Sequence, residues 1–344
     1  MIMLTSALER NLLPDMLIRF GIRRLLRSRL AELGEGGLEA AQMRFGDLVT
    51  RLRREPIAVA TETANDQHYE LPPRFFERVL GAQLKYSCGY WEPWTTSLDQ
   101  AERRMLDLTC QRAELGDGMR ILELGCGWGS LTLYMAERFP GSRITAVSNS
   151  HTQRAFIQQR AHCQGLSNVE ILTCDMNDFE PSGPYDRVVS VEMFEHMRNY
   201  ERLLAKVSAA LREDGKLFVH IFAHREHAYL FEVRDETDWM AQYFFTGGIM
   251  PSDHLLLYFA DDFGIEDHWR VDGRHYEKTA NAWLANMDAH RDEILPLFEE
   301  TYGESEATRW WAYWRTFFMS CAELWGFRGG NEWFVSHYRF RKTG

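Results

Sequence analysis

The sequence predicts an α/β protein with a doubly wound, mostly parallel sheet and a helical extension at its N-terminus. From Leu98 onward, short apolar segments alternate with helical patterns, as in parallel sheets covered by helices on both faces. A segment with three alternating glycines follows the first apolar run. The chain has 344 residues, of which 45% are hydrophobic, enough for one large domain with a smaller appendage.

Residues 1–75 are expected to form the helical extension, and residues 76–344 the core. A first helix beginning near Asp15 mixes apolar side chains with arginines, and a second helix is expected over Leu38–Arg54. The arginine-rich helix has two interpretations. Either it binds a membrane surface, or it packs its apolar side chains on the core and leaves its arginines in solvent.

The elements of the core follow in order along the chain. The predicted strands are Met119–Leu124, Arg143–Val147, Val169–Thr173, Tyr185–Val191, Lys216–Ile221 and Trp333–Phe340, and the predicted helices are Ser130–Arg138, Thr152–Cys163 and Tyr200–Leu211. After the fifth strand the alternation stops and aromatic residues become dense. We expect aromatic-rich helical insertions over about 223–262 and 280–325, placed to roof a pocket.

The first strand runs into a loop, Glu123–Gly129, that predicts a cofactor site. Gly125 and Gly127 allow unusual backbone angles and close approach of a ligand, and ligands of open α/β sheets lie at the carboxyl ends of strands. The spacing differs from the pyrophosphate-binding pattern of dinucleotide sites. It resembles the first motif of class I methyltransferases, with Glu123 fixing loop amides or binding the methionine amino group. A plain tight turn is the alternative.

The ends of the next two strands supply further candidate cofactor residues. Where dehydrogenases place an acid for the ribose, this chain has Ser148, Asn149 and Gln153. The third strand ends beside Asp175 and Met176. Asp175 either binds the adenine amino group or caps the residues that follow it.

The fourth strand runs directly into three ionisable residues, Glu192, Glu195 and His196. Such groups are costly to bury at the end of a strand unless they are paired or used in catalysis. The sequence therefore predicts the active site here, with a structural ion network as the alternative.

Composition excludes several other classes of function. A net charge of −11 argues against a nucleic-acid-binding protein. No apolar run reaches the roughly 18 residues of a spanning helix, and the six cysteines form no C-x-x-C pair, so no metal site is predicted. We expect a cytoplasmic protein without stable membrane insertion. Its oligomeric state is left open, with a homodimer as one alternative.

Three motifs together resemble the cyclopropane-fatty-acid synthase superfamily of class I methyltransferases, and within it the plant coclaurine and related benzylisoquinoline-alkaloid N-methyltransferases. They are Tyr86–Trp91, Glu123–Gly129 and Glu192–His196. The resemblance implies a seven-stranded, Rossmann-like sheet with a helical cap and S-adenosyl-L-methionine as cofactor. It implies that Tyr86 and Ser87 close over the cofactor, that Gly125 and Gly127 cradle its methionine part, and that Glu192, Glu195 and His196 are catalytic or bind substrate. It also places Ser148, Asn149 and Gln153 near the ribose.

The resemblance also separates two substrate classes. The synthases bind a bicarbonate through a cysteine, a glutamate, a histidine and a tyrosine. Cys88, Glu195 and His220 match the first three, whereas the tyrosine position falls on Phe317. The synthases also typically carry glycine where this chain has Glu192. Both departures favour an amine over a lipid, and we assign Cys88, His220, His224 and Phe317 to the substrate pocket.

These observations predict methyl transfer from S-adenosyl-L-methionine to the nitrogen of a small amine. His196 is expected to accept the amine proton, with Glu195 orienting it and Glu192 attracting the ammonium group. The first alternative is a synthase-type transfer to unsaturated lipid acyl chains. The second is a non-catalytic cofactor-binding subunit, a class that usually lacks such acidic and histidine groups.

Overall fold

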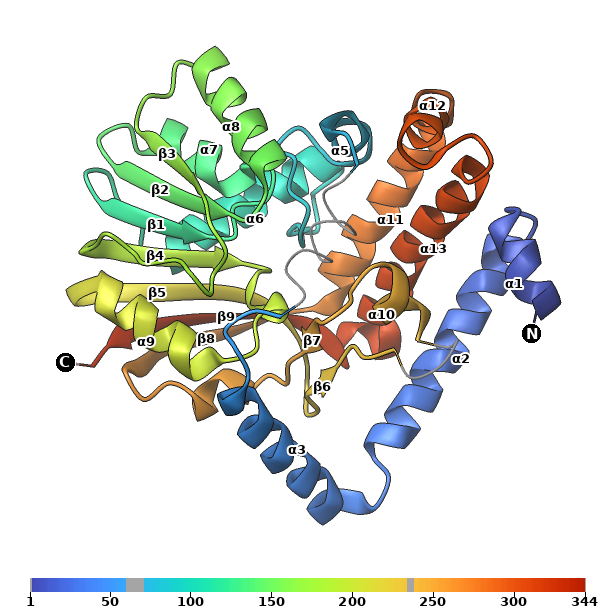
Figure 1. Ribbon diagram of the computed structural model, residues 1–344, viewed down its shortest axis with the longest axis horizontal. Helices are drawn as coiled ribbons and strands as arrows, with labels where there is room; N and C mark the ends of the chain where they lie inside the picture. Colours follow the sequence, from blue (N-terminus) through green and yellow to red (C-terminus); the bar gives the residue numbers. More distant parts are fainter. Residues whose placement is uncertain (1, 60–70, 234–237, 344) are drawn as a thin grey trace.

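A seven-stranded sheet lies at the centre of the computed structural model, which describes residues 2–59, 71–233 and 238–343 (Figure 1). The strand order is β3-β2-β1-β4-β5-β9-β8. The strands are β1 (Arg120–Leu124), β2 (Arg143–Ser148), β3 (Val169–Thr173), β4 (Tyr185–Val191), β5 (Leu211–His224), β8 (Phe263–Val271) and β9 (Trp333–Lys342). β1 to β5 pair in parallel, and β9 is antiparallel to both β5 and β8. The predicted fold class is confirmed.

The order of the strands fixes where a ligand can bind. From β1 the chain moves outward through β2 and β3, then returns to add β4 and β5 on the other side. The crevice outside the carboxyl ends of β1 and β4 is therefore the topological switch point. It is the place where the Glu123–Gly129 loop and Glu192 leave the sheet.

Helices cover both faces of the sheet because the strands alternate their side chains between two cores. Ile121 joins the core beneath α6 (Leu98–Arg112) and α7 (Ser130–Arg138). Leu122 and Leu124 join the core beneath α9 (Tyr200–Ala210) and α3 (Gly37–Arg54). α8 (His151–Cys163) packs on the outer strands β2 and β3.

A helical cap lies beyond the carboxyl ends of the parallel strands (Figure 1). It consists of α5 (Pro73–Val79), α11 (Gly273–Ala289), α12 (Arg291–Tyr302) and α13 (Ala307–Trp325). Its core is aromatic, with Trp283, Trp314 and Phe318 fully buried. The second expected insertion, over about 280–325, is helical but begins about two turns earlier than expected, at Gly273.

The first expected insertion, over 223–262, is largely wrong as a helical segment. Its described residues contain β6 (Tyr229–Leu230), the short helix α10 (Trp239–Tyr243), β7 (Ile249–Met250) and the 3-10 helix η2 (Leu255–Tyr258). Aromatic density indicates burial, but without a helical period it does not indicate a helix. The strand β8 was not predicted either.

The N-terminal extension consists of α1 (Ile2–Glu9), α2 (Asp15–Leu33) and α3, and the structure describes it as far as residue 59 and again from residue 71. α2 lies along α13 (Figure 1). It packs Ile18 and Ile22 on the aromatic core, while Arg19 and Arg23 both pair with Glu323. This supports packing on the core, but these two arginines are paired rather than left in solvent.

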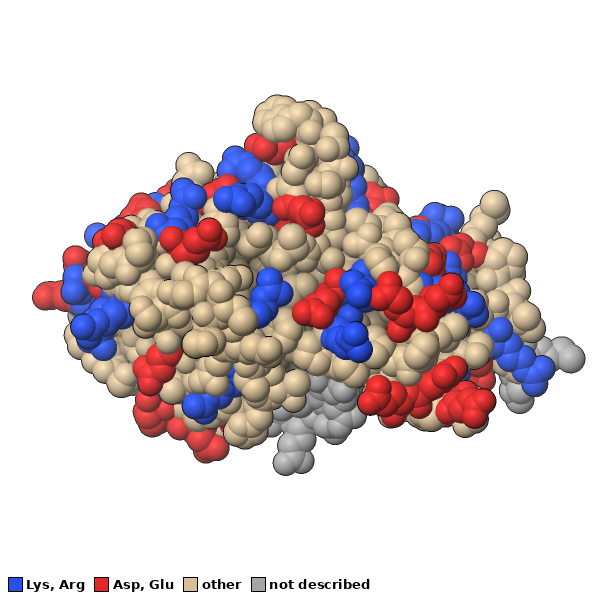
Figure 2. Space-filling model, turned by 90° about the horizontal axis from the view of Figure 1, so that it is seen from above, with Lys and Arg blue, Asp and Glu red and all other residues tan. Residues whose placement is uncertain are grey.

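The surface gives two further observations. Figure 2 shows acidic and basic side chains interspersed over one face, without a broad basic patch. Among the helices described, none is both long enough and apolar enough to cross a membrane.

Candidate active site

A cavity opens at the switch point of the sheet and collects most of the predicted site residues. Its lining includes all ten predicted cofactor residues together with Glu192 and His196. The ten are Tyr86, Ser87, Glu123, Gly125, Gly127, Ser148, Asn149, Gln153, Asp175 and Met176. Six of these twelve residues lie in the loops that follow β1, β2, β3 and β4. Glu123 and Ser148 lie within β1 and β2, Gln153 lies on α8, and His196 on a short 3-10 helix after β4. Tyr86 and Ser87 come from the segment before α6.

The glycine loop leaves room for a ligand along its backbone. Gly125 and Gly127 have left-handed φ angles of +79° and +51°. A side chain added to Gly125 would place its Cβ 2.5 Å from Cβ of Met193, whereas a Cβ added to Gly127 would meet nothing within 4 Å. Gly125 therefore admits the Met193 segment, and Gly127 presents bare backbone to open space.

Glu123 lines the cavity from within β1. Its side chain is buried, and its Oε2 accepts a hydrogen bond of 2.5 Å from the Thr132 hydroxyl. Burial raises the pKa of Glu123 to about 7, while the bond from Thr132 opposes the rise. The carboxylate can attract a cationic group when it is ionised.

Polar atoms in the cavity wall are left without protein partners. Ser148, the last residue of β2, donates its hydroxyl to Gln153 Oε1 at 2.6 Å. Within the described part of the chain, buried Nε2 of Gln153 has no hydrogen-bond partner, and neither have Thr109 Oγ1, Trp128 Nε1 and Ser130 Oγ. Buried polar atoms normally have partners. These four line the cavity, so the site fits a polar ligand such as S-adenosyl-L-methionine.

The position of Asp175 is compatible with both predicted roles, capping the following residues and binding the adenine amino group. Its Oδ1 accepts the backbone N–H of Asn177 at 2.7 Å, which is the turn-capping contact. The residue also lines the cavity. Its second oxygen is therefore the group to consider for an adenine amino group.

Glu192 is held by three donors from three different segments. The Cys88 N–H and His220 Nε2 lie 3.0 Å from its Oε1, and the Tyr276 hydroxyl donates to its Oε2 at 2.6 Å. The side chain is only 9% exposed, so burial raises its pKa; the positive charge of Lys85 and the donors oppose that rise. Burial also keeps the Cys88 thiol neutral, with its pKa well above the usual value.

Glu195 and His196, on the 3-10 helix η1 (Phe194–His196), take different positions. His196 lines the cavity, and burial lowers its pKa to about 4, so its imidazole is neutral near neutral pH. Glu195 is fully buried outside the lining and accepts the Phe222 N–H at 2.7 Å. Its other oxygen has no partner among the described residues, so the predicted orienting bond to His196 is wrong. Burial raises the pKa of Glu195 well above its usual range.

Comparison with known proteins identifies the family. A family model described as mycolic acid cyclopropane synthetase matches residues 59–330. The chain belongs to this family. The predicted resemblance is confirmed, and this member of the mycolic acid cyclopropane synthetase family is an S-adenosylmethionine-dependent methyltransferase.

Relatives within the family include both amine and lipid enzymes. The chain is 41% identical over 343 residues to an (S)-coclaurine N-methyltransferase of Thalictrum flavum subsp. glaucum, covering 98% of this chain and 95% of the relative. It is 32% identical over 238 residues to the cyclopropane-fatty-acyl-phospholipid synthase of Escherichia coli K12, covering 69% of this chain and 59% of the relative.

Solved structures give the same division. Coclaurine N-methyltransferase bound to N-methylheliamine and SAH matches with a TM-score of 0.95 and 40% identity, covering 99% of each chain. The cyclopropane synthase MmaA2 of Mycobacterium tuberculosis matches with a TM-score of 0.70 and 21% identity, covering 83% of this chain and 99% of the other. The second match supports the fold alone.

The structure removes one argument that was drawn from Phe317. Phe317 lies outside the cavity lining, in the cap core, where its ring stacks on Phe244 with centroids 4.5 Å apart. The inference that the site lacks a tyrosine hydroxyl is wrong, because Tyr276 of α11 supplies one to Glu192. The substitution at Phe317 therefore gives no argument for an amine.

Of the other predicted substrate-pocket residues, Cys88 and His220 lie outside the cavity lining but contact Glu192, whereas His224 lies outside it without such a contact. Its Nδ1 accepts the backbone N–H groups of Glu226 and His227, and its Nε2 lies 3.2 Å from Glu332 Oε1. These contacts fix the end of β5, so the assignment of His224 to the substrate pocket is not supported by its position.

Sequence reasoning missed Lys85 as well as Tyr276. Lys85 lines the cavity, is 2% exposed and donates to the Ser87 hydroxyl at 2.5 Å. A lysine directly before the Tyr86–Ser87 pair was a usable signal. Tyr276 gave none, because it lies 84 residues beyond Glu192 on a helix of the cap.

Proposed function

We propose that this enzyme transfers a methyl group to the nitrogen of a small amine of the benzylisoquinoline type. The observation that carries the proposal is the Glu192 carboxylate, held in the cavity wall by Cys88, His220 and Tyr276. In the synthases, the family resemblance implies that such a cysteine, histidine and tyrosine hold a bicarbonate. Here a carboxylate of the chain itself takes up their hydrogen bonds.

The cofactor side of the reaction needs little chemistry from the protein. When bound, S-adenosylmethionine supplies a methyl group already activated on a sulfonium. Gly125 and Gly127 would hold its methionine part, and Glu123 its amino group. Ser148, Asn149 and Gln153 would bind the ribose, and Asp175 the adenine amino group. The protein then aligns the acceptor and excludes water, which can contribute several kcal/mol.

The acceptor side requires a charge and a proton acceptor. An aliphatic amine has a pKa of roughly 10 by analogy with lysine, so it arrives mainly as an ammonium ion. Glu192 attracts that ion, and His196 in the same cavity is the proposed acceptor of its proton, since the nearby charge of Glu192 opposes the burial that lowers the pKa of His196. Both residues leave β4 within a few positions of each other, so they face one substrate. Glu195 serves this arrangement by fixing the Phe222 backbone of β5.

Lipid methylation is the second candidate, and one observation favours it. Cys88, Glu195 and His220 match three of the four residues that the resemblance associates with bicarbonate, and Tyr276 brings a tyrosine hydroxyl to the same group. We favour the amine because Glu192 already accepts hydrogen bonds from three of these four residues.

The test is a methyl-transfer assay with isotopically labelled S-adenosylmethionine against (S)-coclaurine, simpler secondary amines, and phospholipid vesicles with unsaturated acyl chains. We expect label in the amine products and none in the lipids, with Glu192→Gln slowing amine turnover but retaining cofactor binding. Label in the acyl chains with none in any amine would overturn the proposal. A homodimer and a cytoplasmic location stay predictions.

A further inference from the structure

A chain of buried hydrogen bonds leads from Glu192 to the C-terminal end of α6. His220 Nε2 lies 3.0 Å from Glu192 Oε1, and His220 Nδ1 lies 2.9 Å from Nε2 of His337. Nδ1 of His337 in turn lies 2.8 Å from Nη1 of Arg112, the last residue of α6. His220 and His337 are 0% exposed and stand directly opposite each other on β5 and β9.

All hydrogen bonds in this series run in the same direction, from donor to acceptor, because the series begins at an arginine. A guanidinium group donates hydrogen bonds and accepts none, so His337 Nδ1 must accept from Arg112. A neutral imidazole with an accepting Nδ1 carries its proton on Nε2, so His337 donates to His220. By the same argument His220 donates to Glu192.

Both imidazoles are neutral in this arrangement. Burial holds the pKa of His220 and of His337 well below the usual range, and the positive charges of Lys85 and Arg112 act in the same direction. The three hydrogen bonds therefore point toward a single acceptor, the Glu192 carboxylate.

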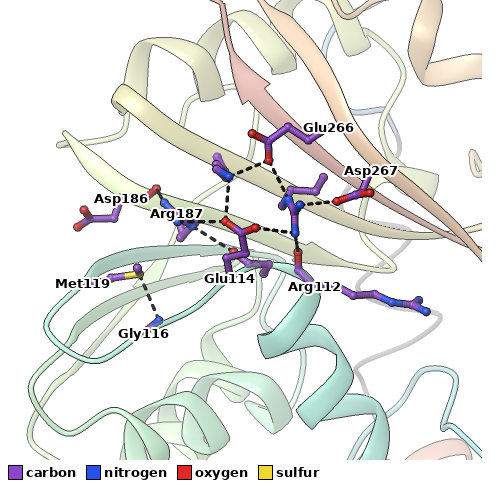
Figure 3. A network of polar contacts seen from close by, with 11 residues as sticks. Arg112, Glu114, Gly116, Met119, Asp186, Arg187, Glu266 and Asp267 are labelled. Carbon is purple, nitrogen blue, oxygen red and sulfur yellow. Dashed lines mark hydrogen bonds and ion pairs between the residues drawn. The ribbon is translucent and has the colours of Figure 1, made fainter.

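The surroundings of Arg112 favour its hydrogen bond to His337 over an ion pair. Its guanidinium lies over the ring of Trp269, 4.9 Å from the centroid, and Trp269 is the β8 neighbour of His337. Figure 3 shows the Arg112 side chain pointing away from Glu114 and Asp267, while its backbone carbonyl accepts a hydrogen bond from Arg339, the arginine that pairs with both of them. No carboxylate of the residues described is ion-paired with Arg112.

We propose that Arg112 and His337 are positioning residues for the methyl transfer, acting through His220 to direct a hydrogen bond at Glu192 and keep its carboxylate ionised. The proposal rests on the proposed role of Glu192 in binding the amine. A donated hydrogen bond favours the charged form of an acid. The chain is not an exit route for the proton, because Arg112 cannot accept one.

Other groups also face the two ends of this chain and set the background for any pH dependence. Those that act on Glu192 are Lys85, Cys88, Glu195, His196, His220, Tyr276 and Cys321. Those that act on the two histidines are Lys85, Arg112 and His268. A substitution at Arg112 leaves all the direct partners of Glu192 in place, so its effect on Glu192 reports only the hydrogen bonds through His337 and His220.

The first measurement needs no variant and no substrate. Long-range proton–nitrogen NMR of the histidine-labelled protein reports which ring nitrogen carries the proton. We expect His220 and His337 to be neutral, with the proton on Nε2 in both, across neutral and mildly alkaline pH. A proton on Nδ1 of either ring, or a charged ring, would overturn the proposal even if no amine were ever methylated.

The second measurement is the pH dependence of turnover on an amine that the protein methylates. In Arg112→Met, the acid limb of the kcat profile should move upward by about one pH unit, with the rate recovering at high pH. Arg112→Lys, which keeps an obligate donor, should move it back. Arg104→Met on the same helix loses its ion pair with Glu92 and is the matched control, with an unshifted limb. An unshifted limb in Arg112→Met, or a uniform loss of rate at all pH values, would contradict the proposal.

Discussion

Glu192 sits in a backbone conformation that its side-chain partners stabilise. Its φ angle of +48° lies in the left-handed region, which is unfavourable for a residue with a side chain. Its N–H donates to the carbonyl of His220 at 2.8 Å, and its carboxylate binds the three donors from Cys88, His220 and Tyr276. In this conformation the carboxylate meets all three donors, so each donor should matter to catalysis.

The Tyr276 hydroxyl provides the sharpest single test of that arrangement. Tyr276→Phe removes one hydrogen bond to a charged acceptor, and we expect kcat for amine methylation to fall by about 10- to 100-fold. Cofactor affinity, measured by calorimetry, should change little. Tyr313→Phe is the matched control, because its hydroxyl binds Glu9 on α1. Equal losses in both variants would show that the cap tolerates neither change and would count against a role for Tyr276.

Glu123 predicts a pH dependence of cofactor binding. Because burial raises its pKa to about 7, Glu123 is ionised above that pH and increasingly protonated below it. Affinity for S-adenosylmethionine should therefore fall as the pH drops through about 7, since the carboxylate that attracts the amino group is lost. Glu123→Gln should bind more weakly and with a flatter pH profile. A wild-type affinity that stays constant through this range would contradict the assignment.

At the level of elements, those with a clear local sequence pattern could be predicted, and those without one could not. β1, the glycine loop and α7 were predictable because an apolar run, a left-handed turn and a helical period follow one another. β8 was not, because only its terminal residues, Phe263 and Val271, are buried, and its apolar alternation is interrupted at Asp267, where the pairing register shifts. The cofactor residues sit beside strand ends and were predictable for the same reason. Tyr276 reaches Glu192 only through tertiary packing of the cap.

The docking of α2 on α13 can be tested through its ion pairs. Glu323 is 12% exposed and binds Arg19 and Arg23, both within 3.0 Å. Glu323→Gln should lower the free energy of unfolding by about 1 kcal/mol, and high salt should reduce the difference. Glu300→Gln, at an exposed position of α12, is the control. Urea denaturation that gives the two variants equal stability would contradict the proposed contribution of these pairs.

For the whole molecule, the site forms where two layers meet. The sheet supplies the cofactor loop and Glu192, whereas the cap supplies Tyr276 from α11 and packs Phe76 and Trp283 against the ring of Tyr86. The cavity lies between them at the switch point. Relatives named for amine and for lipid chemistry share this chain's family, so we propose that a few side chains, above all Glu192, decide the chemistry.

The bicarbonate dependence of turnover tests that central claim most directly. An amine can lose its proton to His196 or to solvent, and the Glu192 carboxylate already occupies the donors that would bind a bicarbonate. The rate of methyl transfer to (S)-coclaurine should therefore be the same in buffer stripped of bicarbonate and in buffer supplemented with it. A rate that collapses without bicarbonate and recovers when it is added would contradict the account.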